Sequence, residues 1–460
     1  MFSVLKVASL PNKGRSYVVT RDVPAGTILL RSRAYVAVPD CGSKSQVCAH
    51  CMLRDASDVT YPHRAPGASV KLPHGCKSCQ QVFYCSAECQ KADSEHYHAS
   101  ECAWLKELFL GLPAASPDRV EAFNSSSNGT QEPEPVKNSQ GFSSYELDFI
   151  WMLARVLINR AREMKTPAHD ASDANAAAAD IAAAGKPSSA DIWAFVANAA
   201  AFSPTAIDRF VTIARVLAAL VRTAILPTAG FPASAENTLL PPGEDALPPS
   251  LRTSLPPLES SIVALICKEE CNSFGLYTFA YAGAKIPRQS YGIGLYPDAV
   301  FFNHSCLPNV GHVTREGNGL RGADESFGAD MVFYAARDMV EGEEAVISYV
   351  ALDESRGRRD GERRTWLEQN FFFACDCKRC NGDAEGTASD IELRKRLDRH
   401  LCGKDGCCGW FVPPQLVTKG AKDSRNDSGK DLARRITEFP ERQRATSRPW
   451  ICEACGRERS

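Results

Sequence analysis

Hydrophobic positions near the start of the chain alternate in two short runs and predict strands. The runs 16–20 and 27–38 are rich in β-branched and aromatic residues, and the sequence DVPAG between them favours a turn. The pattern becomes β-like again from Ser261 to Tyr349, where the runs 331–336 and 345–350 flank the turn sequence DMVEGEE. Two β-rich segments that lie far apart in the sequence are therefore expected to carry the sheets.

Between these segments, apolar positions recur with helical spacing. Residues 145–164 predict a strongly amphipathic helix, and helical signal also covers 101–111 and 191–226. Three stretches without periodicity interrupt this part and are predicted to be flexible insertions, the last of them Pro-rich and extended or disordered: 112–141, 165–189 and 227–257.

Length and charge narrow the class of protein. A chain of 460 residues predicts two or three domains, and 53 Lys and Arg against 55 Asp and Glu give none of the basic excess expected of a duplex-DNA binder. The most apolar run, 211–226, contains Arg215 and Arg222, which argues against a membrane span. The first residues also lack the pattern of a secretory signal, so a reducing compartment is expected.

Cysteines in such a compartment, when spaced in pairs, are more often metal ligands than disulfides. Four pairs between residues 47 and 102 supply the eight ligands that two tetrahedral zinc ions require. The x3 spacing predicts that two of these pairs each share one face of a helix, and His96 is the alternative to His98. The pairs are Cys48 with Cys51, Cys76 with Cys79, Cys85 with Cys89, and His98 with Cys102.

The string VFYCSAECQKAD, followed by H-x3-C, resembles the MYND zinc finger. The resemblance implies interleaved binding, with one zinc ion on Cys48, Cys51, Cys85 and Cys89 and the other on Cys76, Cys79, His98 and Cys102. The finger departs from the usual pattern in the long segment between its first two pairs and in Ser94, where a tryptophan is common. MYND fingers generally bind proline-rich peptides, so such a partner is one expectation and a purely structural finger is the other.

Asn303 and His304 are polar residues in an otherwise apolar segment, GIGLYPDAVFFNHSCLPN, and buried polar groups need partners. Together with NKGRSY near the start, the ISY strand end and FFFACDCKRC, this segment closely resembles the SET domain of protein-lysine methyltransferases. Because the finger interrupts the SET sequence, the chain resembles the SET and MYND domain-containing methyltransferases, of the fungal and arthropod type without a long helical C-terminal domain. The implied fold class is α+β, a mainly-β SET fold interrupted by a MYND finger and a helical insert, with a cysteine-rich zinc-binding post-SET tail.

The resemblance implies a role for individual residues. Tyr349 matches the active-site tyrosine, Phe274 and Phe371 match the substrate channel, and Cys271 to Phe274 match a strand that lines it. The residues implied to bind S-adenosylmethionine are Lys13, Gly14, Arg15, Asn272, Asn303, His304 and Phe373. The implied ligands of a third zinc ion are Cys306, Cys375, Cys377 and Cys380.

Four cysteines near the end complete the candidate metal ligands. Cys402, Cys407, Cys452 and Cys455 predict a fourth zinc site, with Cys408 as the alternative to Cys407. The expected domains are SET N-terminal strands (1–40), the finger (47–102), the helical insert with its three insertions (103–260), the SET catalytic core (261–350), the post-SET zinc segment (351–382) and a C-terminal cysteine-rich segment (383–460).

Two functions compete. The leading hypothesis is transfer of methyl groups from S-adenosylmethionine to the side-chain amine of lysine in histones or other proteins. The alternative is a catalytically silent scaffold that recruits proline-rich partners in transcriptional regulation, and the presence of Asn303, His304 and Tyr349 favours the enzyme. A monomer in the nucleus, the cytoplasm or both is expected, acting on chromatin or other proteins, without membrane or sequence-specific nucleic-acid binding. The target lysine and the number of methyl groups stay open.

Overall fold

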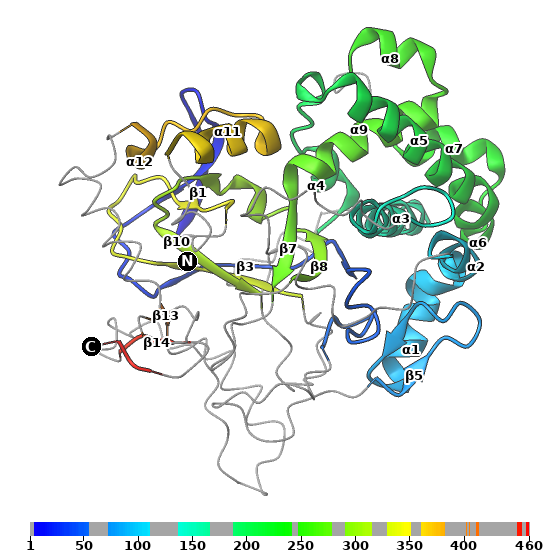
Figure 1. Cartoon of the computed structure of the whole chain (residues 1–460), viewed down its shortest axis with the longest axis horizontal. Helices are drawn as coiled ribbons and strands as arrows, with labels where there is room; N and C mark the ends of the chain where they lie inside the picture. Colours follow the sequence, from blue (N-terminus) through cyan, green and yellow to red (C-terminus); the bar gives the residue numbers. More distant parts are fainter. Residues whose placement is uncertain are drawn as a thin grey trace, which may run out of the picture.

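A computed structural model gives the architecture of the chain (Figure 1). It describes residues 4–54, 72–110, 137–165, 187–241, 247–277, 290–314, 329–350, 360–381, 402, 404, 411–413, 449–452 and 457–459. Within these residues a β-rich part and a helical part lie side by side, and the finger segment packs at the lower end of the helical part in this view (Figure 1). The expected α+β fold class is confirmed.

An antiparallel hairpin of β1 (Leu5–Leu10) and β2 (Gly14–Val19) begins the described chain. The sequence pattern missed β1, because most of its side chains are exposed and only Leu5 is buried. The turn between the strands holds Asn12 at φ 60° and Gly14 at φ 69°, in the left-handed region that glycine adopts without strain. The hairpin therefore presents Lys13, Gly14 and Arg15 at its tip.

One three-stranded sheet joins the first strands to the second half of the chain. β3 (Ile28–Ser32) pairs antiparallel with β11 (Met331–Ala335), and β11 pairs with β10 (Val310–Thr314). Beneath this sheet Phe302 stacks on Phe333, with ring centroids 4.5 Å apart. The two predicted β-rich segments thus share one apolar core.

A second sheet has the order β4 (Val36–Pro39), β8 (Ser290–Leu295) and β7 (Ser273–Tyr277). Gly292 makes the close approach of β8 to its neighbour possible, because a Cβ atom there would lie 2.5 Å from the Val38 carbonyl oxygen. The helix α3 (Ser144–Glu163) packs across β4 and β8, so this sheet is the seam between the β-rich and helical parts.

The helical part is organised around α3 (Ser144–Glu163). Its first turn is closed by a capping box, in which Ser143 and Glu146 satisfy each other's backbone N–H groups. α5 (Pro204–Leu220) and α9 (Pro257–Asn272) pack beside it, and Trp151 at the centre of α3 is fully buried. The amphipathic helix predicted for 145–164 is therefore present.

Two expectations for this region are wrong. Residues 257–272 form α9 and not a strand, because the helix is buried on nearly every face and leaves no one-sided apolar pattern to read. The stretch 227–257 also contains short packed helices: Leu239, Leu240 and Leu247 are buried in the helical core. Proline there begins helices, as in α8 (Pro249–Ser254), and does not exclude them.

The described part of the chain contains one helical run, Pro204–Ala229, that is long and apolar enough to cross a membrane by length and composition. Arg215 and Arg222 therefore do not exclude a span by themselves, contrary to the expectation from the sequence. Half of its most apolar window is buried inside the protein, against α3 and α9, as is common for a core helix.

The remaining elements are short. They are β5 (His74–Gly75), β6 (Phe83–Tyr84), α1 (Ala87–Asp93), α2 (Ala99–Leu108), α4 (Ser189–Trp193), α6 (Leu226–Ala229), α7 (Glu236–Leu239), β9 (Asn303–His304), β12 (Val346–Ile347), α11 (Asp360–Phe371), α12 (Lys378–Asn381), β13 (Phe411–Val412) and β14 (Ile451–Cys452).

Candidate functional site

The finger segment brings its eight expected ligands into two groups of four. Cys48, Cys51, Cys85 and Cys89 form one group and Cys76, Cys79, His98 and Cys102 the other, with the ligand atoms of each group within 4.8 Å of one another. The described cysteines are all free of disulfides. Three thiols with an imidazole, or four thiols, fit a tetrahedral zinc ion. The interleaved arrangement implied by the resemblance is the one found.

The local structure around these ligands differs from the expected pair of x3 helices. Cys85 precedes α1, whose N-cap Ser86 accepts a hydrogen bond from the Cys89 backbone N–H. His98 ends a π-helical turn, 94–98, that joins α1 to α2, and its Nε2 lies 3.7 Å from Cys79 Sγ. His96 instead lies 2.8 Å through Nε2 from Asn159 Oδ1 on α3. The open choice between the two histidines is thereby settled geometrically for His98.

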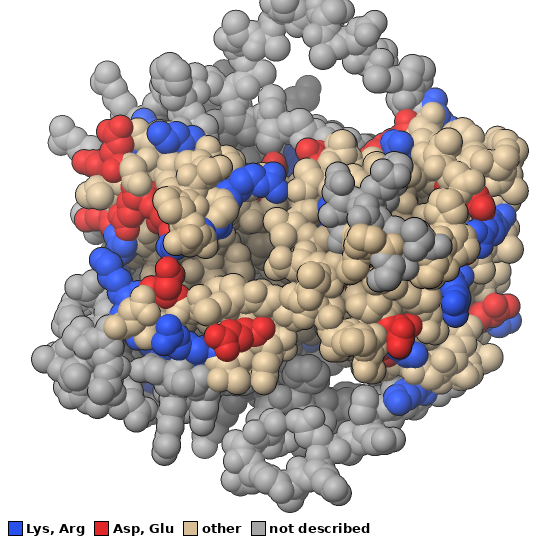
Figure 2. Space-filling view, turned by 90° about the horizontal axis from the view of Figure 1, so that it is seen from above, with Lys and Arg blue, Asp and Glu red and all other residues tan. Residues whose placement is uncertain are grey.

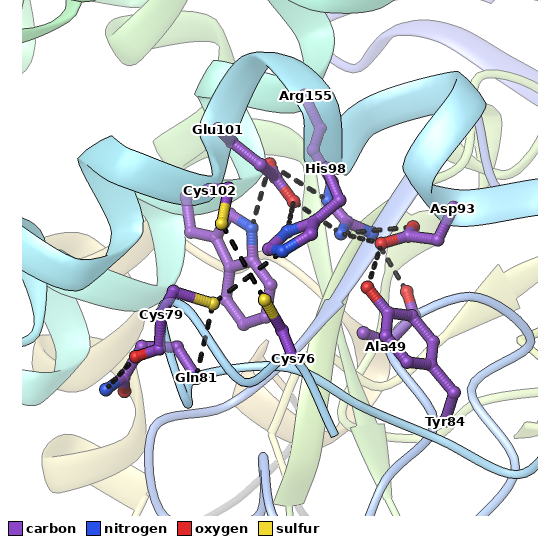
Figure 3. Close-up of polar contacts among 11 residues, drawn as sticks. Ala49, Cys76, Cys79, Gln81, Tyr84, Asp93, His98, Glu101, Cys102 and Arg155 are labelled. Atoms are coloured by element: carbon purple, nitrogen blue, oxygen red, sulfur yellow. Dashed lines mark hydrogen bonds and ion pairs between the residues drawn. The ribbon is translucent and has the colours of Figure 1, made fainter. Parts of the chain in front are cut away.

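Next to the second group lies a buried cluster of charges (Figure 3). Arg155 of α3 donates to Glu101 Oε1 at 2.7 Å and to the Ala49 carbonyl at 2.9 Å, and its Nη2 lies 3.2 Å from Asp93 Oδ1. Burial lowers the pKa of Arg155, but the two carboxylates outweigh this effect and raise it overall. A permanently charged guanidinium therefore joins both finger helices to α3.

Glu101 also faces the histidine of the metal group. Its Oε1 lies 4.0 Å from His98 Nδ1, and its Oε2 accepts a hydrogen bond from Trp151 Nε1 at 3.2 Å. A carboxylate behind the non-ligating nitrogen is the common arrangement around metal-bound histidine. Sequence spacing gave no sign of this cluster, because Arg155 is about fifty residues away from Glu101 along the chain.

A third group joins residues 375–380 to the residue that follows β9 by two positions, Cys306. Cys306, Cys375, Cys377 and Cys380 have their sulfur atoms within 4.8 Å of one another, and Cys306 Sγ lies 3.6 Å from Cys380 Sγ. Hydrogen bonding among these thiols lowers the pKa of Cys377 and raises that of Cys306. The set implied by the resemblance is again the set brought together.

Beside this group, the short strand β9 runs parallel to β12 and places His304 against Tyr349. His304 Nδ1 accepts a hydrogen bond from the Tyr349 backbone N–H at 2.9 Å, and the Tyr349 hydroxyl donates to the Phe302 carbonyl at 2.9 Å. The rings of Phe371 and Phe373 lie 5.0 and 6.2 Å from the Tyr349 ring. Burial raises the pKa of Tyr349, so its hydroxyl stays protonated at neutral pH.

Glu344 ties the hairpin tip to this site, although its sequence context did not mark it as a site residue. Its carboxylate accepts from Lys13 Nζ at 2.7 Å, from Ser16 Oγ at 2.9 Å and from Asn303 Nδ2 at 3.1 Å. Burial raises the pKa of Glu344, but these donors outweigh it and lower the pKa overall. The only hint in the sequence was the acidic turn that precedes β12.

Arg15 and Asn272 have other partners. Arg15 Nη2 donates to the Ala194 carbonyl at 2.8 Å, and Asn272 Nδ2 donates to the Val196 carbonyl at 2.8 Å. The expected strand from Cys271 to Phe274 is only partly correct, since Cys271 and Asn272 end α9 and β7 begins at Ser273. The Phe274 ring contacts Tyr296 and Phe333.

Two of the last four candidate ligands can be placed. Cys402 and Cys452 are both buried in a cluster with Trp450, Phe411 and Tyr334, at the side of the sheet that holds β11. β13 and β14 pair within this cluster (Figure 1). Cys407, Cys455 and the alternative Cys408 lie outside the described residues.

The molecule seen from above carries acidic and basic side chains interspersed around a largely uncharged middle (Figure 2). Among the described residues on this face there is no continuous basic stripe of the kind that binds nucleic-acid backbones. The mixed surface agrees with the near-zero net charge of −2.

The sequence is similar to known proteins that contain a MYND finger. Residues 48–102 match the family model described as MYND finger. A SET and MYND domain-containing protein of Dictyostelium discoideum is 22% identical over 420 residues, 90% of this chain and 91% of that protein.

Two of the similar proteins are named as methyltransferases. Histone-lysine N-methyltransferase ASHR2 of Arabidopsis thaliana is 25% identical over 410 residues, 86% of this chain and 77% of that protein. Histone-lysine N-methyltransferase SMYD3 of Mus musculus is 22% identical over 393 residues, 85% of this chain and 65% of that protein. Over most of its length the chain is thus similar to SET and MYND domain-containing proteins, and residues 48–102 match the MYND finger.

Proposed function

We propose that the protein transfers methyl groups from S-adenosylmethionine to the side-chain amine of lysine in other proteins. The observation that carries the proposal is the convergence of Asn303, His304 and Tyr349 with the aromatic rings of Phe371 and Phe373. The names of the methyltransferase relatives support the same class of activity. Histone tails and other lysine-bearing proteins are the proposed substrates.

The residues around the hairpin tip fit the amino-acid end of the methyl donor. Asn303 donates hydrogen bonds through Nδ2 to the Glu344 carboxylate and to the Lys13 carbonyl. Among the residues that the structure describes, no group donates to its Oδ1. That oxygen is available to accept from an ammonium group, and the Lys13 and Arg15 side chains supply positive charge for a carboxylate. The donor supplies an activated methyl group on a sulfonium when it is bound.

The protein's part in this chemistry is mainly positioning. Displacement at a methyl group needs an in-line approach, and well-oriented reactants gain roughly 7 to 11 kcal/mol over free ones. The Tyr349 hydroxyl is proposed to orient the amine, and Phe371 and Phe373 to keep water away. An apolar channel beside a positive charge disfavours the ammonium form of lysine, so the amine arrives neutral.

The first expected result concerns metal. The three cysteine-rich groups, with the C-terminal cysteines as a fourth, predict about three or four zinc ions per chain in purified protein. Elemental analysis checks this number. Folded protein with a zinc content near zero would rule out the metal assignment of all these cysteines.

The second expected result concerns the methyl donor. Asn303→Ala removes the amide proposed to hold the ammonium group, so affinity for S-adenosylmethionine should fall about tenfold to a hundredfold, the equivalent of roughly 1 to 3 kcal/mol. Calorimetry measures this affinity. Asn159→Ala is the control, because it removes hydrogen bonds of the same kind to His96 and to the Tyr35 carbonyl. Equal affinity in wild type and Asn303→Ala contradicts the assigned site.

A scaffold without activity is the second candidate, in which the finger recruits proline-rich partners in transcriptional regulation. The MYND finger supports protein binding in general. Nuclear and cytoplasmic sites of action, and a monomeric state, remain part of the proposal. Labelling of cell extract with isotopic methyl donor, followed by mass spectrometry, distinguishes enzyme from scaffold and identifies the target lysine.

A further inference from the structure

A short loop of the helical part is held through its carbonyl groups by side chains from two other elements, the hairpin tip and the end of α9. Four consecutive carbonyls accept from four side chains: Ala194 from Arg15 at 2.8 Å, Phe195 from Lys268 at 2.6 Å, Val196 from Asn272 at 2.8 Å and Ala197 from Cys271 Sγ at 3.6 Å. Arg15 comes from the hairpin tip and the other three from the end of α9. We call residues 194–198 the carbonyl-held loop.

Lys268 is the unexpected member of this set. Its side chain is 7% exposed, and its Nζ contacts the Phe195 carbonyl and lies 5.5 Å from the centre of the Trp193 ring. Among the described residues, no carboxylate forms an ion pair with Lys268. Burial lowers the pKa of Lys268, and the neighbouring Arg15 charge lowers it further. A buried ammonium without an acidic partner is costly, so packing alone does not account for it.

The carbonyl groups of residues 194–197 accept hydrogen bonds from side chains, whereas several backbone N–H groups of the loop have no backbone acceptor within the described residues. Asn198 lies in the left-handed region at φ 44°, where the chain turns into the next helical turn. Within the described residues, the backbone N–H groups of Val196, Ala197 and Asn198 meet no backbone acceptor. Such a loop suits a ligand rich in acceptor atoms, as a carboxylate, a ribose or a purine ring is.

We propose that Lys268 is a positioning residue, which fixes the carbonyl-held loop as one wall of the methyl-donor site. The inference rests on the proposed function and adds a residue and a loop that the sequence resemblance does not assign. Arg15 and Asn272 then act at least partly through the loop, because their donors are directed to its carbonyls.

Lys268→Met is the decisive variant. Methionine fills a similar volume without a charge, so the variant should fold with a melting temperature equal to that of wild type or higher. The loop loses the hydrogen bond to Phe195, so affinity for S-adenosylmethionine should fall about tenfold. The KM for the methyl donor should rise by a similar factor while kcat stays within about twofold. If Lys268 merely stabilised the fold, Lys268→Met would lower the melting temperature and leave the ratio of kcat to KM unchanged.

Two further variants make the result specific. Lys268→Arg keeps a cationic donor and should restore affinity to within about threefold of wild type. Arg160→Met is the matched control, because it also removes a bond from a cationic side chain to a carbonyl, that of Leu239, in another part of the helical region. Arg160→Met should bind the methyl donor as wild type does.

The outcomes separate the two proposals. If wild type does not bind S-adenosylmethionine at all, the proposed function fails. If wild type binds it and Lys268→Met binds it equally well, or if Lys268→Met does not fold, the role of Lys268 is overturned while the proposed function stands. Hydrogen exchange at residues 194–198 provides an independent reading, and we expect it to be at least about tenfold faster in Lys268→Met.

Discussion

Tyr349→Phe should reduce methyl transfer by at least about a hundredfold, a loss on the order of 3 kcal/mol in transition-state stabilisation. The change deletes the hydroxyl proposed to orient the lysine amine. It spares the backbone hydrogen bond to His304 and the ring contacts with Phe371 and Phe373. Binding of S-adenosylmethionine should therefore stay close to wild type, and stability should fall only by what the lost hydrogen bond to the Phe302 carbonyl contributes. Single-turnover rates and calorimetry measure the two quantities separately.

Tyr17→Phe is the matched control for this experiment. The Tyr17 hydroxyl also donates to a backbone carbonyl, that of Asp298 at 2.8 Å, and its ring also packs among aromatic residues. Loss of a buried hydroxyl should cost both variants a similar amount of stability, about 1 kcal/mol. If Tyr349→Phe is as active as wild type, the catalytic assignment fails. If wild type with bound methyl donor modifies no protein, the scaffold function takes its place.

Arg155→Met should cost roughly 3 to 5 kcal/mol in the free energy of unfolding, the largest stability effect that we expect from one substitution. It leaves Asp93 and Glu101 buried without their cation, at the point where both finger helices meet α3. Zinc should also dissociate faster from the group that contains His98, because Glu101 loses the partner that holds it behind the imidazole. Denaturant unfolding and chelator-induced zinc release measure these effects.

Two further variants test whether the burial of charge causes the loss of stability expected for Arg155→Met. Arg209→Met breaks an ion pair with Glu146 that is about one third exposed, and should cost at most about 1 kcal/mol. The triple variant Arg155→Met, Asp93→Asn, Glu101→Gln removes all three charges together and should recover part of the lost stability. An Arg155→Met variant no less stable than Arg209→Met would contradict the proposed role of the cluster.

The ligand pairs of the finger could be predicted from the sequence because their spacing is local, while their interleaved grouping came from the family resemblance. The group of Cys306 with the tail could not be derived in the same way: its cysteines are separated by about seventy residues, and only the family resemblance joined them. Spacing favoured His98 through its i,i+4 relation to Cys102 but left His96 open. The choice depended on Asn159, which packs against His96 from another helix.

The errors have a common physical cause. The segment of α9 has a β-like pattern because burial on nearly every face removes the helical alternation of apolar and polar residues. Glu344 and Lys268 were missed because their partners lie far away along the chain: Lys13 for the first and the Phe195 carbonyl for the second. A charged residue whose partner comes from another segment looks like an ordinary surface residue until the chain is folded.

The pairing of β3 with β11 has a consequence for the order in which a new chain can assemble. Ser32 is opposite Met331, so β3 must wait through synthesis of most of the protein before it gains its neighbour. All ligands of the finger, in contrast, lie within residues 48–102. The finger can thus take up metal on the ribosome while β3 and β4, which precede it, still lack their partners β11 and β8. Those early strands, and not the cysteine-rich module, are where a chaperone is needed.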